Sequence, residues 1–272
     1  MRALVLIAVL SGCHRGIRVP DGQRCAVEGD ERACTYDTTR IRWGRLSSRK
    51  VHYQTPLGSP PAEGWPVAIL FQGSLHPAKT FWSAKRGDAF GGWHQVGVVE
   101  ELLDGGFAVV TPNAANGAWW QTNVLPYAAA WTASPDHQLM LALFDAIDAG
   151  ELGALDGDHL VAAGISSGGY MTSRMAASYP GRFEALAIQS ASWATCSGAV
   201  CVLPDALPGD HPPTLFLHGA DDVVVPPRTM EPYAEALAAD GVPVEVLLDD
   251  DAGHEWLPEA PEAVVEWFVD PP

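Results

Sequence analysis

A serine within a glycine-rich hexapeptide is the first feature of this chain that could do chemistry. The segment Gly164-Ile165-Ser166-Ser167-Gly168-Gly169 matches the pattern G-x-S-x-G, with an apolar stretch before it and a helix-like stretch after it. In that context the serine occupies a tight turn from strand to helix, and small residues two positions away let the two elements approach. The helix N-terminus favours developing negative charge. We therefore expect Ser166 to act as a nucleophile.

Ser167 is the competing nucleophile. Its own frame places Ile165 where the pattern requires a glycine, so the pattern favours Ser166. A glycine-rich turn can also occur without any catalytic role. The partner residues elsewhere in the chain must therefore decide between a catalytic turn and a structural one.

The general base is the first of these partners, because a serine hydroxyl is a poor nucleophile at neutral pH. The chain has nine histidines. His254 lies in a short loop between the last predicted strand and the last predicted helix, where the order Ser…Asp…His places the base. His218 instead ends a predicted strand, and we interpret it as structural.

An acid must hold the imidazole in the right tautomer and stabilise its charged form. Two adjacent aspartates, Asp221 and Asp222, follow a predicted strand and compete for this role. The run from Asp249 to Asp251 directly precedes His254, and we interpret it as a solvated acidic turn.

Acyl transfer also needs backbone N–H donors for the oxyanion of the tetrahedral intermediate. The amide of Ser167 directly follows the nucleophile and is one candidate. The second donor is expected from the loop after an earlier strand, which reads Gln72-Gly73-Ser74. We therefore predict an oxyanion hole formed by the amides of Ser74 and Ser167.

The elements that must position these residues alternate between strand-like and helix-like stretches. Period-two alternation at 40–43 and 50–53 predicts an antiparallel edge hairpin. Beyond it, alternating strands and helices predict a mostly parallel central sheet with helices on both faces. Strands are expected at 66–71, 107–110, 158–165, 183–189, 214–218 and 242–248, and helices at 93–104, 136–149, 169–179, 229–239 and 259–268.

Four segments together give the chain a family resemblance. It resembles the poly(3-hydroxybutyrate) depolymerase-like and feruloyl/acetylxylan-esterase-like branch of the α/β-hydrolases, from about Val51 to the C-terminus. The resemblance implies an α/β-hydrolase fold without a large lid, and ester hydrolysis through a Ser-His-Asp triad without metal or cofactor. The segments that carry it are Phe71-Gln72-Gly73-Ser74, Gly164 to Met171, His218-Gly219 to Pro226, and Gly253-His254-Glu255-Trp256.

The resemblance also bears on individual residues. Hydrolases of this kind often show H-G-x-x-D-x-x-V-P, a spacing that selects Asp222 over Asp221. Many relatives have His-Gly where this chain has Gln72-Gly73, and many have a cysteine where Ser74 stands. These departures bear on the polyester assignment and on the second oxyanion donor.

The substrate side of the predicted site is open and rich in tryptophan. Only about twenty residues, 191–212, separate two predicted strands, which leaves no room for a large helical lid. We expect an open cleft for bulky or polymeric esters. Trp119, Trp120 and Trp256 fall in loops on the side where such sheets bind ligands, and we expect them to form its wall. Packing inside the protein is the alternative role for each of them.

The composition narrows the class of protein further. The chain has 272 residues, of which 47% are hydrophobic and 18% charged, as in a globular domain. Its net charge of −17 repels phosphate backbones, so nucleic acid is not expected as a partner.

The N-terminus predicts export. Met1-Arg2 precedes an apolar run from Ala3 to Leu10, which is too short to span a bilayer and fits a signal peptide. The run ends in Leu10-Ser11-Gly12-Cys13, which resembles the lipobox of bacterial lipoproteins; a buried first strand is the alternative. We expect an extracytoplasmic protein, secreted or lipid-anchored through Cys13 at the cell envelope. The predicted divisions are a signal peptide at 1–12, a tether and disulfide loop at 13–38, and a catalytic domain at 39–272.

Four further cysteines remain. Their local spacing predicts Cys25–Cys34 and Cys196–Cys201 disulfides in an oxidising compartment, although the sequence leaves the other two pairings open. The chain contains no C-x-x-C pair of the kind that binds zinc.

Two other functions fit parts of the sequence. A serine peptidase of the prolyl-oligopeptidase-like kind would use the same triad, but such enzymes usually carry an additional domain. A surface-anchored binding protein could present a tryptophan-lined cleft without catalysis, although the Ser…Asp…His order argues against it.

Overall fold

The computed structural model describes residues 17–115 and 117–272. The predicted signal peptide and the predicted lipidation site at Cys13 lie outside these residues. Within the described part of the chain, no helix combines the length and apolar character that crossing a membrane requires.

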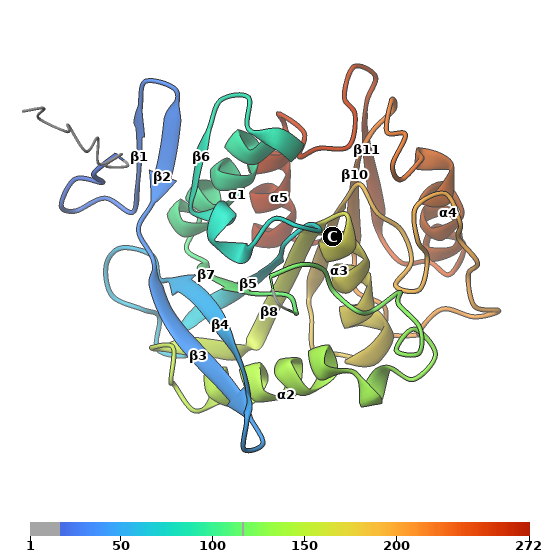
Figure 1. The fold of residues 1–272 in the computed structure, drawn as a ribbon, viewed down its shortest axis with the longest axis horizontal. Coiled ribbons are helices and arrows are strands. Elements are labelled where there is room, and N and C mark those ends of the chain that lie inside the picture. The colour runs from blue at the N-terminus through green and yellow to red at the C-terminus, as the bar shows by residue number, and fades with distance from the viewer. Residues whose placement is uncertain (1–16, 116) are drawn as a thin grey trace, which may run out of the picture.

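An eight-stranded sheet runs through the centre of the molecule, in the order β11-β10-β9-β8-β5-β7-β4-β3 (Figure 1). The strands from β11 to β7 are mutually parallel, whereas β4 and β3 form an antiparallel hairpin at one edge. This arrangement confirms the predicted sheet and its edge hairpin. The strands are β3 (Asp37–Trp43), β4 (Ser47–Gln54), β5 (Trp65–Phe71), β7 (Ala108–Pro112), β8 (Leu155–Ile165), β9 (Ala185–Gln189), β10 (Thr214–Gly219) and β11 (Val244–Asp249).

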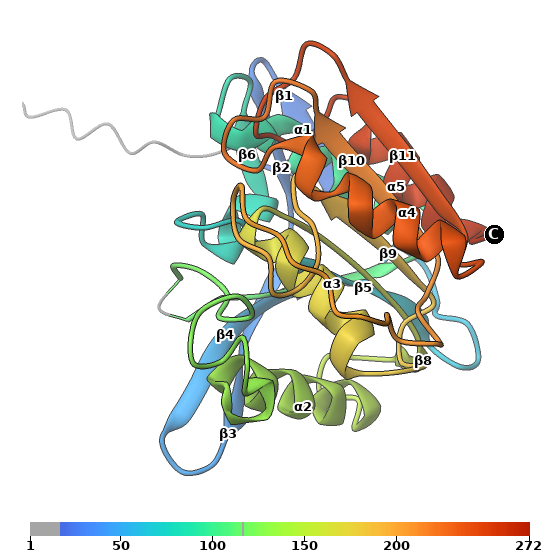
Figure 2. The same cartoon turned by 90° about the vertical axis from the view of Figure 1, so that its right-hand side faces the viewer.

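Helices cover both faces of this sheet (Figures 1 and 2). On β5, Ala68 and Leu70 pack in the core that α1 and α5 share, whereas Val67, Ile69 and Phe71 pack in the core formed with α2 and α3. Burial on both faces explains why this strand is a continuous apolar run in the sequence. The helices are α1 (Gly92–Asp104), α2 (Pro135–Asp148), α3 (Ser167–Ser178), α4 (Glu231–Ala239) and α5 (Ala260–Val269), with short 3₁₀ turns η1 (Ala78–Phe81), η2 (Ala89–Gly91), η3 (Trp131–Ala133) and η4 (Pro227–Thr229).

The start of α2 shows how local chemistry sets an element boundary. The Ser134 hydroxyl accepts a hydrogen bond from the Asp136 amide at 3.0 Å, and Pro135 occupies the first helical position. A serine cap followed by proline is a favoured helix start, because both account for amides that have no partner within the helix. The helix therefore begins one residue before its predicted start.

The segment before Thr38 is more regular than the sequence predicts. β1 (Cys25–Glu28), β2 (Glu31–Cys34) and β6 (Ser83–Lys85) form a separate three-stranded antiparallel sheet. Only a tether and a disulfide loop were expected here, because strands this short show no clear period and their partner β6 is distant in the sequence. The Cys25–Cys34 disulfide closes this hairpin.

The connection between β9 and β10 contains the other disulfide, Cys196–Cys201. Both predicted cysteine pairings are therefore confirmed. The described residues of this connection form no helix, in agreement with the prediction of a fold without a large lid.

Candidate active site

Ser166 occupies a strained turn between β8 and α3. Its backbone has φ 56° and ψ −121°, a conformation that costs free energy in any residue with a side chain. The Ser166 amide donates a hydrogen bond to the carbonyl of Gln189 at 3.1 Å, which fixes the turn against β9. Strain that surrounding structure maintains in this way is typical of a functional site.

The glycines of the hexapeptide are required by close packing. A Cβ atom at Gly164 would lie 2.5 Å from the carbonyl oxygen of Gly168, and a Cβ at Gly168 would collide with the backbone of Phe71. Strand β8, helix α3 and strand β5 therefore meet at contact distances that only glycine permits. This packing supplies the steric reason for the pattern around Ser166.

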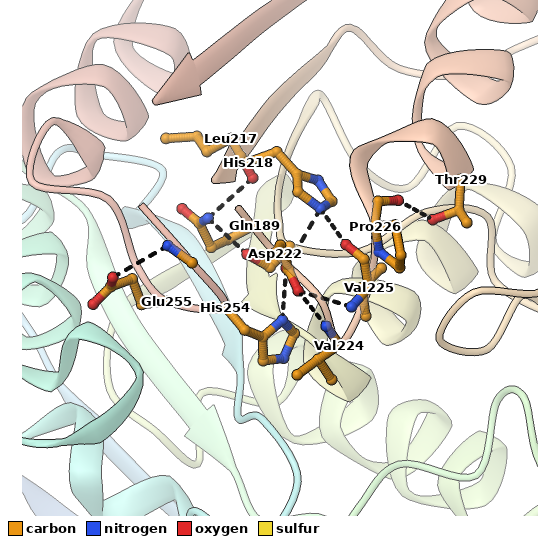
Figure 3. Close-up of polar contacts among 12 residues, drawn as sticks. Gln189, Leu217, His218, Asp222, Val224, Val225, Pro226, Thr229, His254 and Glu255 are labelled. Atoms are coloured by element: carbon orange, nitrogen blue, oxygen red, sulfur yellow. Dashed lines mark hydrogen bonds and ion pairs between the residues drawn. The ribbon is translucent and has the colours of Figure 1, made fainter. Parts of the chain in front are cut away.

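The structure brings His254 and Asp222 together from two different loops (Figure 3). The Nδ1 atom of His254 lies 2.7 Å from Oδ2 of Asp222. The other carboxylate oxygen accepts hydrogen bonds from the amides of Val224 and Val225, at 2.9 and 2.8 Å. Asp222 is buried whereas Asp221 is exposed, so the carboxylate that reaches the histidine is that of Asp222.

The surroundings of Asp222 favour its charged form. Burial alone would raise the pKa of the carboxyl, but hydrogen bonds from His218, His254 and the Val225 amide outweigh it and hold the pKa well below its usual range. The Nε2 atom of buried His218 lies 2.7 Å from the Val225 carbonyl and 3.5 Å from Oδ2 of Asp222. His218 thus braces the loop that carries the acid, in keeping with its structural interpretation.

A cavity of about 250 Å³ connects the base with the strained serine. His254 and Ser166 both line it. Its other walls are mostly apolar, with a few polar groups, as in pockets that bind small molecules. The remaining lining residues are Gly73, Ser74, Leu75, His76, Phe90, Gln95, Ile165 and Val224.

Phe90 is a wall residue that the sequence analysis missed. It has φ 60° and ψ 30°, and its carbonyl accepts a hydrogen bond from the Trp256 amide at 3.1 Å. The ring stands edge-on to two imidazoles, with centroid distances of 4.5 Å to His76 and 5.7 Å to His254. Only its position before Gly91-Gly92 hinted at a turn, and nothing in the sequence indicated its contact with His254.

The two candidate oxyanion donors belong to residues close to the serine turn. Ser74 lines the cavity and Ser167 is the first residue of α3. Among the described residues, neither backbone amide has a hydrogen-bond partner. Both amides thus retain a free donor, which an oxyanion hole requires.

The side chain of Gln72, which follows β5, hydrogen-bonds to the loop that follows β7. Its amide group donates to the Gly117 carbonyl and accepts from the Ala114 amide, each at 3.2 Å. The side chain is fully buried. Gln72 therefore anchors the loop that follows β7.

Two of the three predicted tryptophan wall residues are corrected by the structure. Trp120 and Trp256 are fully buried, so neither can form an open wall. The indole N–H of Trp120 donates to the Gln72 carbonyl and that of Trp256 to the Gln95 side chain, both at 3.1 Å. Because each indole N–H finds a buried acceptor, each ring can be removed from water completely. Trp119 is 47% exposed on its loop.

The parallel sheet, the serine turn and the buried Asp222–His254 pair define an α/β-hydrolase. Solved structures share this fold: acetyl xylan esterase from Aspergillus awamori matches with a TM-score of 0.62 and 15% identity, covering 86% of this chain and 98% of that one. S-formylglutathione hydrolase from Staphylococcus aureus matches with a TM-score of 0.60 and 16% identity, covering 93% of this chain and 100% of that one. No family model matches the chain.

A curated relative defines the family more closely. The chain is 44% identical over 266 residues to the poly(3-hydroxyoctanoate) depolymerase of Pseudomonas fluorescens. The aligned region covers 97% of this chain and 95% of that protein. The chain belongs to the family of that depolymerase and is a serine carboxylic-ester hydrolase.

Proposed function

We propose that the protein cleaves its ester through an acyl-enzyme formed on Ser166. The Ser166 hydroxyl attacks the carbonyl carbon while His254 takes its proton through Nε2, and Asp222 holds the opposite ring nitrogen. One observation carries this assignment: His254 forms a 2.7 Å hydrogen bond with Asp222 and lines the same cavity as the strained Ser166.

The remaining steps use the groups around that cavity. The Ser74 and Ser167 amides hold the oxyanion of the tetrahedral intermediate. His254 then returns the proton to the departing alcohol, which leaves an acyl group on Ser166. A water molecule activated by His254 hydrolyses this second ester and restores the serine.

The proposed substrate is an aliphatic polyester of the 3-hydroxyalkanoate class. The relative's name supports this choice, because it is a depolymerase of such a polymer. The apolar side chains of Leu75, Phe90 and Val224 on the cavity wall suit the alkyl side chains of such a polyester. The unlidded connection after β9 gives a long chain access. Feruloyl and acetylated sugar esters are the competing substrates.

We also propose that the protein acts outside the cytoplasm. Its two disulfides support this location, since disulfides persist in oxidising compartments. The signal peptide at 1–12 and the lipid on Cys13 belong to the same proposal, as does a catalytic domain that begins near residue 39. Mass spectrometry of the N-terminal peptide of the mature protein tests whether Cys13 is its first residue and carries acyl chains.

A fluorophosphonate probe tests the nucleophile directly. We expect the wild-type protein to be labelled at Ser166, and Ser166→Ala to lose both labelling and hydrolysis of p-nitrophenyl butyrate. Ser167→Ala should still be labelled, because its hydroxyl has no role in the proposal. Labelling that survives in folded Ser166→Ala would overturn the assignment.

A substrate panel tests the remaining choice. Films of poly(3-hydroxyoctanoate), feruloyl esters, acetylated sugars and an aminoacyl anilide would be compared at equal enzyme concentration. We expect the film and nitrophenyl esters to be hydrolysed. Preferential cleavage of the anilide would instead support the peptidase alternative.

A further inference from the structure

The β3–β4 hairpin projects from the body of the molecule at the lower edge of both overall views (Figures 1 and 2). Its charge is opposite to that of the whole protein. Residues 38–62 contain five Lys and Arg residues and no Asp or Glu, although acidic residues outnumber basic ones by 33 to 16 in the complete chain. The hairpin is therefore a positive segment of an acidic protein.

The two faces of the hairpin differ in character. On one face, Ile41 and Val51 pack in the core formed with α2. Side chains alternate between the two faces along each strand, so the sequence neighbours of these residues project from the opposite face. Arg40 and Arg42 on β3 and Lys50 on β4 occupy that opposite face, and all three are exposed. One face is thus apolar and covered, whereas the other is cationic and open to solvent.

The open face places like charges side by side. Arg40 and Lys50 are directly opposite each other in the antiparallel register, an arrangement that destabilises a sheet. Within residues 17–115 and 117–272, neither of them forms an ion pair with a carboxylate, and Arg42 forms none either. Charged side chains protect an exposed sheet edge from other strands, but that role does not require two cations in register.

The positive charge continues at both ends of the hairpin. Near its base, burial and then the charges of Lys50 and Lys79 lower the pKa of His52, so both ammonium groups lie near that ring. At the tip, Arg45 is exposed beside Leu46, whose side chain is 99% exposed. We call these cations together the cationic hairpin surface, which comprises Arg40, Arg42, Arg45, Lys50 and Lys79.

This surface can attract an anion in spite of the net charge of the protein. A strand rises about 3.4 Å per residue, so the cations from Arg40 to Arg45 extend over roughly 15 Å. At physiological ionic strength, charges farther away than about 8 Å are largely screened. An anion that reaches the hairpin therefore meets five positive charges, while the acidic residues of distant elements repel it only weakly.

We propose that the cationic hairpin surface binds the headgroups of an anionic lipid membrane, with Leu46 entering the interface at the tip. Basic residues near an anionic bilayer and a buried apolar side chain both strengthen binding to a membrane surface. A soluble polyanion offers no apolar phase for Leu46, and a second copy of the chain would bring a further charge of −17.

This inference is independent of the proposed ester chemistry, because none of the five cations lines the cavity that contains Ser166. It agrees with the proposed lipid on Cys13. Attachment of a protein to a membrane is firm when an acyl chain is joined by a basic surface.

Matched double variants test the surface. Arg40→Gln with Lys50→Gln removes one arginine and one lysine from it. Lys85→Gln with Arg228→Gln is the control, because it removes the same two residue types from exposed positions on β6 and η4. Every protein would carry Cys13→Ala, so that no acyl chain contributes. Binding to vesicles of equal parts phosphatidylglycerol and phosphatidylcholine would be measured by co-sedimentation in 0.1 M NaCl.

We expect the control to bind like the parent and the hairpin variant to bind about tenfold or more weakly, since each basic residue near an anionic bilayer strengthens binding about fivefold. Equal binding of the hairpin variant and the control would overturn the proposal. The hairpin variant should hydrolyse p-nitrophenyl butyrate like the parent. It should also resist urea at least as well, because two like charges in register are removed.

Measurements on the parent protein do not rely on a variant. Binding should weaken about tenfold or more on pure phosphatidylcholine vesicles and in 1 M NaCl, where charges are screened beyond about 3 Å. Unchanged binding under either condition would contradict an electrostatic lipid site. Duplex DNA that displaces the protein from the vesicles at equal phosphate concentration, or a lipid-free dimer that the hairpin substitutions dissociate, would replace the membrane with nucleic acid or a second copy.

A fluorescent label tests the tip separately. Nitrobenzoxadiazole attached to Leu46→Cys should brighten on phosphatidylglycerol vesicles, because the label leaves water when the tip enters the interface. The same label on Val269→Cys is the control, since this side chain is 60% exposed but lies at the end of α5. We expect no brightening there. An equal response at the two positions would refute an approach of the membrane through the hairpin tip.

Discussion

The ring of Phe90 stands edge-on to the imidazole of His254, with 5.7 Å between the two centroids. Both residues line the cavity that contains Ser166. A residue in a left-handed conformation thus limits the space beside the proposed catalytic base. This contact gives the first prediction.

Phe90→Ala should enlarge the cavity and remove one lateral support of His254. We expect kcat/KM for p-nitrophenyl butyrate to fall about tenfold, equivalent to roughly 1.4 kcal/mol of transition-state stabilisation, and the octanoate-to-butyrate ratio to rise. Steady-state kinetics on the two esters would measure both effects. Phe90→Leu, which keeps most of the bulk, is the control. If Phe90→Ala left both kcat/KM values unchanged, Phe90 would have no part in the site.

Asp222→Asn should leave His254 in the wrong tautomer for accepting a proton. The amide can still hydrogen-bond to Nδ1 but cannot stabilise an imidazolium, so kcat should fall about a thousandfold or more. Asp221→Asn is a matched control, because this neighbouring carboxylate is exposed. We expect the control to keep wild-type kcat on p-nitrophenyl butyrate. A comparable loss in both variants would mean that Asp222 has no special role.

Gly168→Ala should prevent correct packing of α3 against β5. The added Cβ would collide with the Phe71 backbone, and backbone cannot move aside as a flexible side chain can. We expect a loss of about 3 kcal/mol or more in the free energy of unfolding, measured by urea denaturation. Gly209→Ala is the control, since a Cβ there would meet no atom within 4 Å. Two variants of equal stability would contradict the close packing described for the serine turn.

His211 should make the protein less stable in mild acid. Burial lowers its pKa to about 4, although the hydrogen bond to the Pro212 carbonyl opposes the shift. Above pH 6.5 the residue is neutral in both folded and unfolded chains and has no effect. Between about pH 6.5 and 4 only the unfolded chain binds the proton, so the free energy of unfolding should fall by roughly 3 kcal/mol. Below pH 4 both states are protonated and the loss stays constant.

The His211→Asn variant isolates this effect, because asparagine does not titrate. Urea denaturation at several pH values should give a shallower decline for the variant than for the wild type over that interval. Parallel declines would show that other groups cause the acid sensitivity.

The sheet and the proposed triad could be predicted because their signals lie in contiguous stretches of the sequence, even though the contacts behind them are tertiary. The strand at 66–71 is apolar throughout because it is buried on both faces, and the glycines around Ser166 follow from contacts within a few ångströms. The order of Ser166, Asp222 and His254 along the chain reflects the order of the strands that carry them.

The cavity wall could not be predicted, since it depends on contacts between distant residues. Trp256 is buried because its N–H meets Gln95, 161 positions earlier in the chain. Trp120 is buried against Gln72 for the same kind of reason. Their predicted loop positions suggested that tryptophans form the wall, but the cavity is lined by the phenyl ring of Phe90 and by none of the three.

The short connection between β9 and β10, closed by Cys196–Cys201, has a kinetic consequence. An entrance without a helical cover cannot respond to an interface by opening, so turnover of soluble esters should rise hyperbolically with concentration and show no jump at the solubility limit. Any preference for a solid over dissolved ester would then arise from how long each molecule resides on the solid, and not from a switch in the molecule itself.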